Sequence, residues 1–217
     1  MTLHTKAGCN LNKDVKPSSG NGKAYTGKVL GTNCDAKANH NGGCGVLAAD
    51  DDTFGAGVKK NGYVVYAMLW DQEGVKIWNF KKGKVPKDLT DGAPDPSTWP
   101  TPDAFWSPDT CKIDQFFKEH VIVINTTLCG WVDSPLFLLS GFLTSHCFRD
   151  WAGSAYKSSG CPSTCDEYIE DPNNFKEAKW EINNVDVYDY SKDGAKADKG
   201  SKSHKHHHSH SKSGSDC

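Results

Sequence analysis

The sequence predicts an all-β protein in which antiparallel strands form a sandwich. Three observations support this fold class: runs of β-branched and aromatic residues are separated by long loops, the two helical patterns are short, and no strand–helix–strand repeat occurs. The chain has 217 residues, 36 % of them hydrophobic, which suits one domain with a sizeable core rather than two domains.

The clearest element is a β-hairpin. Residues 63–70 are β-branched or aromatic on both alternating faces, which predicts a strand covered on both sides. The sequence Asp71-Gln72-Glu73-Gly74 supplies the turn, and residues 75–80 return as the partner strand. We expect Trp70 and Trp78, which lie in this hairpin, to belong to the core.

The other predicted strands and helices are short. Strands are expected at 121–127 and 178–190, and helices at 163–169 and just after the Asp109-Thr110 cap. Residues 8–62 indicate loop tied by disulfides.

A proline-rich segment covers residues 91–109 and contains Trp99 and Trp106, whose rings favour an ordered structure. For both tryptophans, packing within the loop and binding at the rim of a site are equal alternatives.

Composition excludes several classes of partner. A formal charge of −2 leaves no basic surplus for nucleic acid, and the longest apolar run, at 135–143, is too short to span a membrane. Nine cysteines indicate an oxidising compartment and therefore secretion, although Met1 to Cys9 lacks the basic and apolar regions of a signal peptide.

Residues 191–217 are rich in Lys, Ser and His and have no apolar period, which predicts a disordered tail. Its histidine run at 205–210 would bind Zn²⁺, Cu²⁺ or Ni²⁺ opportunistically, and a solvated tail is the preferred interpretation. We expect no metal site, no cofactor and a monomer.

Short motifs spread from the first residue to Tyr190 carry a resemblance to one family. They are Met1-Thr2-Leu3-His4-Thr5 with Gly8-Cys9, Gly31-Thr32-Asn33-Cys34-Asp35, Gly42-Gly43-Cys44-Gly45, Val75-Lys76-Ile77-Trp78, Pro94-Asp95-Pro96-Ser97-Thr98-Trp99, the segment 125–130, Asp150-Trp151-Ala152-Gly153 and Trp180-Glu181-Ile182-Asn183. In this order they resemble the fungal-type branch of glycoside hydrolase family 16, the endo-1,3(4)-β-glucanases and laminarinases.

The resemblance implies a concanavalin-like antiparallel β-jelly roll that cuts β-1,3- or mixed β-1,3/1,4-glucan with retention. In that family both catalytic carboxylates lie on one strand in a Glu-x-Asp-x-x-Glu motif, and no such spacing occurs in this sequence. We therefore identify no catalytic residue in this sequence. We expect residues 1–190 to be the C-terminal part of such a domain, truncated just after its active-site strand. We also expect this chain to be inactive.

The segment at 131–149 also departs from the family pattern, which runs directly from Cys-Gly to Asp-Trp-Ala-Gly. Its codons can supply a splice donor, a branch point and an acceptor, which indicates a retained intron. A loop insertion is the alternative, and an exposed Leu-rich loop would be an aggregation liability.

By the same resemblance, His4, Asp150 and Trp151 bind the glucan, with Trp151 stacking on a sugar ring. The alternatives are a structural histidine or a frayed terminus for His4, and core packing for Trp151. Two functions of different class follow, a secreted β-glucan hydrolase and a non-catalytic, lectin-like β-glucan-binding protein. The expected partner in both is β-glucan polysaccharide.

Overall fold

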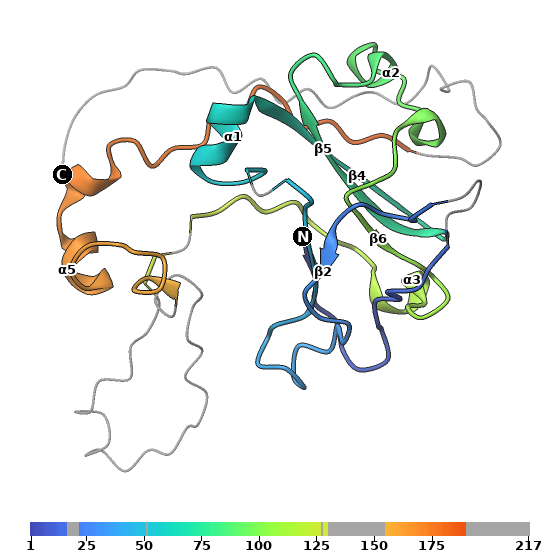
Figure 1. Cartoon of the computed structure of the whole chain (residues 1–217), viewed down its shortest axis with the longest axis horizontal. Helices are drawn as coiled ribbons and strands as arrows, with labels where there is room; N and C mark the ends of the chain where they lie inside the picture. Colours follow the sequence, from blue (N-terminus) through green and yellow to red (C-terminus); the bar gives the residue numbers. More distant parts are fainter. Residues whose placement is uncertain (17–21, 51, 127, 130–154, 190–217) are drawn as a thin grey trace. The chain divides into compact units, whose positions relative to one another are not determined.

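The computed structural model describes residues 1–16, 22–50, 52–126, 128–129 and 155–189 (Figure 1). The described residues divide into two compact units, Met1–His120 with 187–189 and Val121–Asp186. The predicted tail at 191–217 and the departure at 131–149 lie outside the described residues.

The first unit contains a small antiparallel sheet of three strands in the order β1-β3-β2. The strands are β1 (Thr2–Leu3), β2 (Lys28–Val29) and β3 (Cys44–Leu47). Met1 extends the pairing, because its ammonium group donates to the Val46 carbonyl (3.0 Å) and its carbonyl accepts from the Val46 N–H (2.8 Å). The sequence predicts loop for most of this region, because runs of two to four residues carry no periodic signal.

The second sheet contains the predicted hairpin. Strands β4 (Tyr63–Asp71) and β5 (Gly74–Lys81) pair antiparallel, and β6 (Ala104–Trp106) pairs with β5 on its other side. The Asp71 carboxylate accepts the Glu73 N–H (2.8 Å) in the turn. Gly74 has φ of 130°, and a Cβ there would lie 2.4 Å from the Trp106 carbonyl oxygen, so the turn and the packing both require glycine.

The proline-rich segment is ordered and supplies β6, which was not predicted. The 3₁₀ helix η1 (Pro96–Thr98) is capped by Asp95, whose side chain accepts the Ser97 N–H. The Trp99 indole donates to Asp88 (2.8 Å), and the Trp99 ring makes an edge contact with Trp78. Trp99 therefore packs against β5 and Asp88, while its side chain is only partly buried, so binding at the rim of a site stays a prediction.

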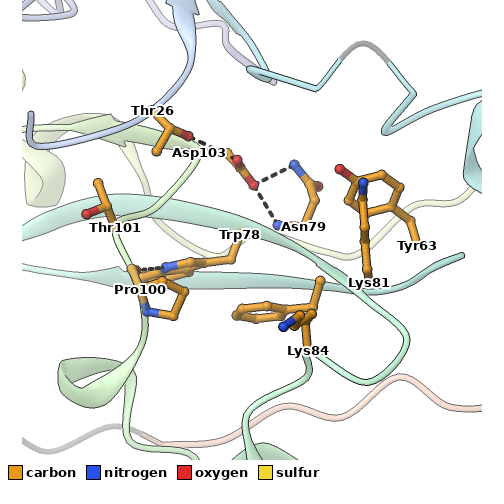
Figure 2. A pocket seen from close by; sticks show the side chains of 10 residues that line it. Thr26, Tyr63, Trp78, Asn79, Lys81, Lys84, Pro100, Thr101 and Asp103 are labelled. Atoms are coloured by element: carbon orange, nitrogen blue, oxygen red, sulfur yellow. Dashed lines mark hydrogen bonds between the residues drawn. The ribbon is translucent and has the colours of Figure 1, made fainter. Parts of the chain in front are cut away.

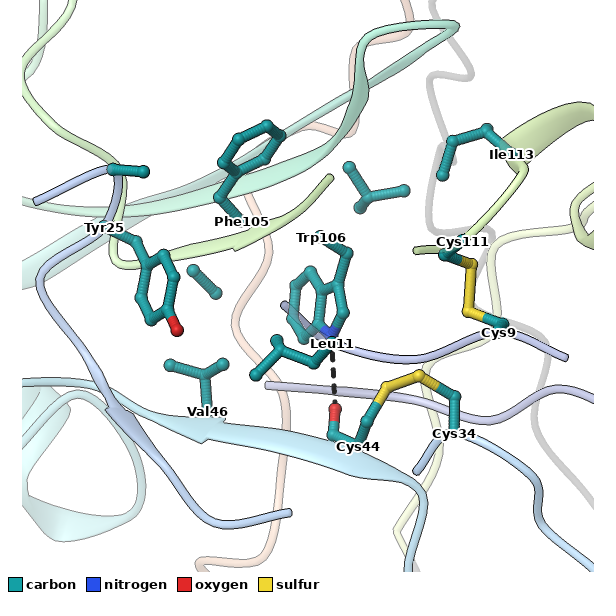
Figure 3. Close-up of a cluster of buried hydrophobic side chains, with 13 residues drawn as sticks. Cys9, Leu11, Tyr25, Cys34, Cys44, Val46, Phe105, Trp106, Cys111 and Ile113 are labelled. Atoms are coloured by element: carbon teal, nitrogen blue, oxygen red, sulfur yellow. Dashed lines mark hydrogen bonds between the residues drawn. A yellow bond between two sulfur atoms is a disulfide. The ribbon is translucent and has the colours of Figure 1, made fainter. Parts of the chain in front are cut away.

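Trp106 lies at the centre of the core (Figure 3). Its side chain is fully buried, and its indole N–H donates to the carbonyl oxygen of Cys44 (3.2 Å), which joins β6 to β3. The disulfides Cys9–Cys111 and Cys34–Cys44 belong to the same cluster. Since β6 belongs to one sheet and β3 to the other, this hydrogen bond connects the two sheets across the core.

The expectation that the strand at 63–70 is covered on both sides is wrong for the described residues. Tyr66 and Met68 are 55 % and 64 % exposed, and Trp70, expected in the core, is 38 % exposed. Their antiparallel partners on β5 are Asn79, Ile77 and Val75, and paired residues point to the same side of a sheet. The three side chains therefore lie on the side of the sheet where Val75 is buried in the core. Trp78, by contrast, is buried as predicted.

The two predicted helices are present. The first is α3 (Ile113–Phe116), which begins after Lys112 rather than at Asp109-Thr110. The second is α5 (Cys165–Glu170), where Thr164 and Glu167 form a reciprocal capping box. Three further short elements were not predicted: α1 (Ala56–Asn61), α2 (Lys87–Thr90) and η3 (Pro172–Phe175). None of the described helices is long and apolar enough to cross a membrane.

The strands expected at 121–127 and 178–190 are not formed in their described parts, 121–126 and 178–189. β-branched residues favour a strand only where a neighbouring strand accepts the backbone hydrogen bonds, and no such pairing is present there. The second unit is held instead by the disulfide Cys129–Cys165 and by packing of Tyr168 against Phe175.

Replacing Trp106 with alanine removes the bond to Cys44 and leaves a cavity between the sheets. Since a buried Trp→Ala change costs about 3–5 kcal/mol, we expect a loss of that size in the free energy of unfolding, measured by urea titration. Trp70→Ala is the matched control, and its exposed side chain predicts a clearly smaller loss. Equal losses in the two variants would contradict the central position of Trp106.

Candidate functional site

His4 is the one predicted glucan-binding residue that the structure describes, because Asp150 and Trp151 lie outside the described residues. It follows directly on β1, and its side chain is exposed. The backbone on either side is fixed, since Leu3 pairs with Cys44 and Thr5 forms a bridge to Asp35. His4 is therefore not part of a frayed terminus.

Gly43 packs against the His4 side chain. A Cβ at Gly43 would lie 2.5 Å from the Leu3 carbonyl oxygen, 2.7 Å from Thr2 Cγ2 and 2.9 Å from His4 Cε1. Gly43 also has φ of 64°, which a residue with a Cβ adopts only with strain. The motif Gly42-Gly43-Cys44-Gly45 marks this position in the sequence, but the contact between Gly43 and His4 is visible only in the structure.

Asn39 holds the turn that brings Gly43 to this position. Its side-chain amide donates to the carbonyl oxygens of Asn33 (2.7 Å) and Gly43 (3.1 Å), and its side-chain oxygen accepts the Gly43 N–H (3.1 Å). The disulfide Cys34–Cys44 closes the same segment. The His4 side chain thus rests on a turn that is fixed by hydrogen bonds and by a covalent link.

A hollow of about 340 Å³ lies elsewhere in the first unit, beside Trp78 and Asp103 (Figure 2). The Asp103 carboxylate accepts from the Asn79 N–H (2.8 Å) and side-chain amide (2.9 Å), and from the Thr26 hydroxyl (3.2 Å). The Trp78 indole donates to the Pro100 carbonyl oxygen (2.7 Å).

The aromatic side chains that line this hollow offer little surface for a sugar. Tyr63, Trp78 and Phe80 are each no more than 8 % exposed, so their rings are already covered. Its acidic and indole groups are likewise engaged in internal hydrogen bonds. We interpret the hollow as part of the packing between the loop at 100–103 and β5.

Asp50 forms an ion pair with Lys81 in the first unit. Its carboxylate accepts from Lys81 Nζ (2.6 Å) and from the Tyr63 hydroxyl (2.8 Å), and the Lys81 ammonium lies 4.9 Å from the centre of the Tyr63 ring. The hydrogen bond from Lys81, with those from the Asp52 N–H and Tyr63, lowers the pKa of Asp50 to about 2. The same hydrogen bond raises the pKa of Lys81.

A carboxyl group with a lowered pKa is poorly suited to be the proton donor of a retaining glycosidase. Such an enzyme uses one carboxyl group with a raised pKa as the proton donor. Backbone and side-chain hydrogen bonds from Thr164 lower the pKa of Glu167. At Asp88, burial acts to raise the pKa, but hydrogen bonds from the Asp95 N–H and the Trp99 indole outweigh it, so the pKa is lowered. Within the described residues, every carboxyl group with a shifted pKa is shifted downward.

Gly43→Ala tests whether the turn supports His4, with Gly83→Ala as its control. Both glycines have positive φ, so each variant carries about 1–3 kcal/mol of backbone strain. A Cβ at Gly83 meets nothing within 4 Å, whereas one at Gly43 meets β1 and His4. We expect Gly43→Ala to lower the free energy of unfolding more and to shift the His4 ring signals in an NMR spectrum. An unshifted His4 spectrum would contradict the contact.

Comparison with known proteins identifies the family. Residues 1–188 match the model of the XgeA-like catalytic domain of glycoside hydrolase family 16. A probable glycosidase of Schizosaccharomyces pombe is 36 % identical over 194 residues, covering 88 % of this chain and 40 % of the relative. An endo-1,3(4)-β-glucanase of Arthroderma benhamiae is 34 % identical over 196 residues, covering 86 % of this chain and 37 % of the relative.

Solved structures agree with this match. Laminarinase 16A of Phanerochaete chrysosporium, a family 16 protein with β-glucans in its donor and acceptor sites, superposes with a TM-score of 0.62 at 32 % identity and covers 80 % of this chain. This chain spans 51 % of that laminarinase and about two fifths of the curated relatives named above. The resemblance found from the motifs is confirmed, and the chain belongs to glycoside hydrolase family 16, in its XgeA-like branch.

Proposed function

We propose that the catalytic domain to which this sequence belongs hydrolyses the glycosidic bonds of β-1,3- or mixed β-1,3/1,4-glucan with retention. The match of residues 1–188 to the XgeA-like catalytic domain carries this proposal, and relatives named endo-1,3(4)-β-glucanases support it. In fold terms, the two antiparallel sheets would belong to a concanavalin-like β-jelly roll.

The 217-residue chain on its own would not hydrolyse glucan. Retaining hydrolysis needs two carboxyl groups about 5–5.5 Å apart, one as nucleophile and one as acid and base. The six glutamates of the sequence stand at 73, 119, 167, 170, 177 and 181, and none belongs to a Glu-x-Asp-x-x-Glu motif. The lowered pKa values of Asp50, Asp88 and Glu167 also oppose a role as proton donor.

Glucan contact would fall to His4, Asp150 and Trp151. The axial C–H face of glucose is apolar and stacks on an indole, while its hydroxyl groups need polar partners such as imidazole and carboxylate. The fixed backbone around His4 supports this role, because a binding group on a rigid element needs no ordering when the ligand arrives.

Three disulfides in the described residues support a secreted protein. We propose a monomer with residues 1–190 as one domain region, 131–149 as intron-derived sequence or an inserted loop, and 191–217 as a tail.

A non-catalytic β-glucan-binding protein is the second candidate. The exposed His4 on its fixed turn favours this function, because it needs no catalytic pair. The exposure of Tyr66 and Met68 counts against this function for the isolated chain. Exposed apolar surface of this kind promotes association between protein molecules.

One experiment separates the two functions. The full chain is incubated with laminarin and barley β-glucan, and released reducing ends are compared with a blank without protein. We expect no release above the blank, and measurable turnover would contradict the assignment of inactivity. In parallel, binding to laminarin is measured by calorimetry, and binding by a soluble monomer without turnover would support the non-catalytic β-glucan-binding function.

Variants of the same chain test the residues. His4→Ala and Trp151→Ala should each weaken laminarin binding at least about tenfold, which corresponds to 1.4 kcal/mol. His40→Asn is the control, because His40 is exposed and asparagine tolerates its φ of 52°. If the parent chain binds laminarin and neither His4→Ala nor Trp151→Ala weakens that binding, His4 and Trp151 do not belong to the binding site.

A further inference from the structure

The chain carries a single motif for N-linked glycosylation. Of its asparagines, only Asn125 is followed by the pattern x-Ser/Thr, in Asn125-Thr126-Thr127. A motif of this kind recurs by chance, so its position in the structure decides whether the amide can be reached.

Asn125 is exposed in the second unit. Residues 121–126 form neither helix nor strand, and among the described residues the Asn125 amide makes no hydrogen bond. The neighbouring Thr126 hydroxyl accepts the Trp180 indole N–H (3.1 Å). The acceptor nitrogen of Asn125 is thus free of internal partners within the described chain.

The disulfide Cys129–Cys165 begins four positions after Asn125. Protein disulfides form in oxidising compartments such as the lumen of the endoplasmic reticulum, and N-linked glycans are added in that same lumen. A chain that forms this disulfide in a eukaryotic cell therefore passes the enzyme that reads the motif. This step rests on the proposed secretion and not on glucan hydrolysis.

We propose that Asn125 is an N-glycosylation site. The donor would be an oligosaccharide linked to a lipid pyrophosphate. The Asn125 amide nitrogen attacks C1 of the first sugar, the bond from C1 to the pyrophosphate oxygen breaks, the lipid pyrophosphate leaves, and the amide proton passes to a base of the transferase.

The segment just before Asn125 gives such a glycan a physical consequence. Val121, Ile122, Val123 and Ile124 are 80 %, 65 %, 71 % and 47 % exposed. An uncharged run of β-branched residues is prone to strand pairing between chains. A large hydrated group on Asn125 would lie next to this run and oppose such pairing.

The test uses the full 217-residue chain behind a cleavable secretory leader, translated with microsomes and also expressed in a eukaryotic secretory host. We expect a single mass shift that peptide N-glycosidase F removes. Asn125→Gln and Thr127→Ala should both lose the shift, and Thr127→Ser should keep it. Asn183→Gln, an exposed asparagine outside the motif, is the control and should keep it.

Glycosylation accompanies translocation, so the microsome measurement reads the site even for a variant that does not fold. A parent chain that is protected from added protease inside the microsomes, and yet shows no shift, would overturn the proposal. A shift that persists in Asn125→Gln would do the same.

Discussion

The hydrogen bond from the Trp106 indole to the Cys44 carbonyl oxygen is the contact on which the first unit depends. It satisfies a buried polar N–H and fixes the distance between the two sheets at their centre. An unpaired indole N–H in this position would carry a desolvation penalty of about 1–3 kcal/mol, so the bond also selects how the sheets pack. Cys44 is bonded to Cys34 as well, which couples the core to the turn that carries Gly43.

The coupling continues from the core to the candidate site. Cys44 pairs with Leu3, the residue before His4, and Gly43 lies next to the His4 side chain. The position of His4 is therefore set by the same strand that receives the Trp106 hydrogen bond. Within the first unit, β3 therefore supports both the core and the candidate site.

The hairpin could be predicted because its alternating apolar residues and its turn sequence are local signals. β6 could not, because three residues among prolines carry no period, and the burial of Trp106 arises from contacts with residues such as Cys44, 62 positions away. The error on β4 has a different cause. Apolar residues on both faces of β4 indicate that the strand is suited to burial. Whether Tyr66, Met68 and Trp70 are buried depends on whether another segment covers them, which the local sequence does not show.

The site was predicted only in part, for a similar reason. The motifs around His4 and Cys44 identified the family, but the support from Gly43 and Asn39 became visible only when the turn was placed against β1. The disulfide pairings could not be chosen from spacing, because Cys9 joins Cys111 at a separation of 102 residues.

Hydrogen exchange followed by NMR on the full chain tests whether the Trp106–Cys44 contact holds the two sheets together. We expect the Trp106 indole proton and the amide protons of β3 and β5 to exchange slowest, and the indole proton of Trp180, whose side chain is 64 % exposed, to exchange quickly. Equal exchange rates for the two indole protons would contradict the claim that the Trp106–Cys44 contact holds the sheets together.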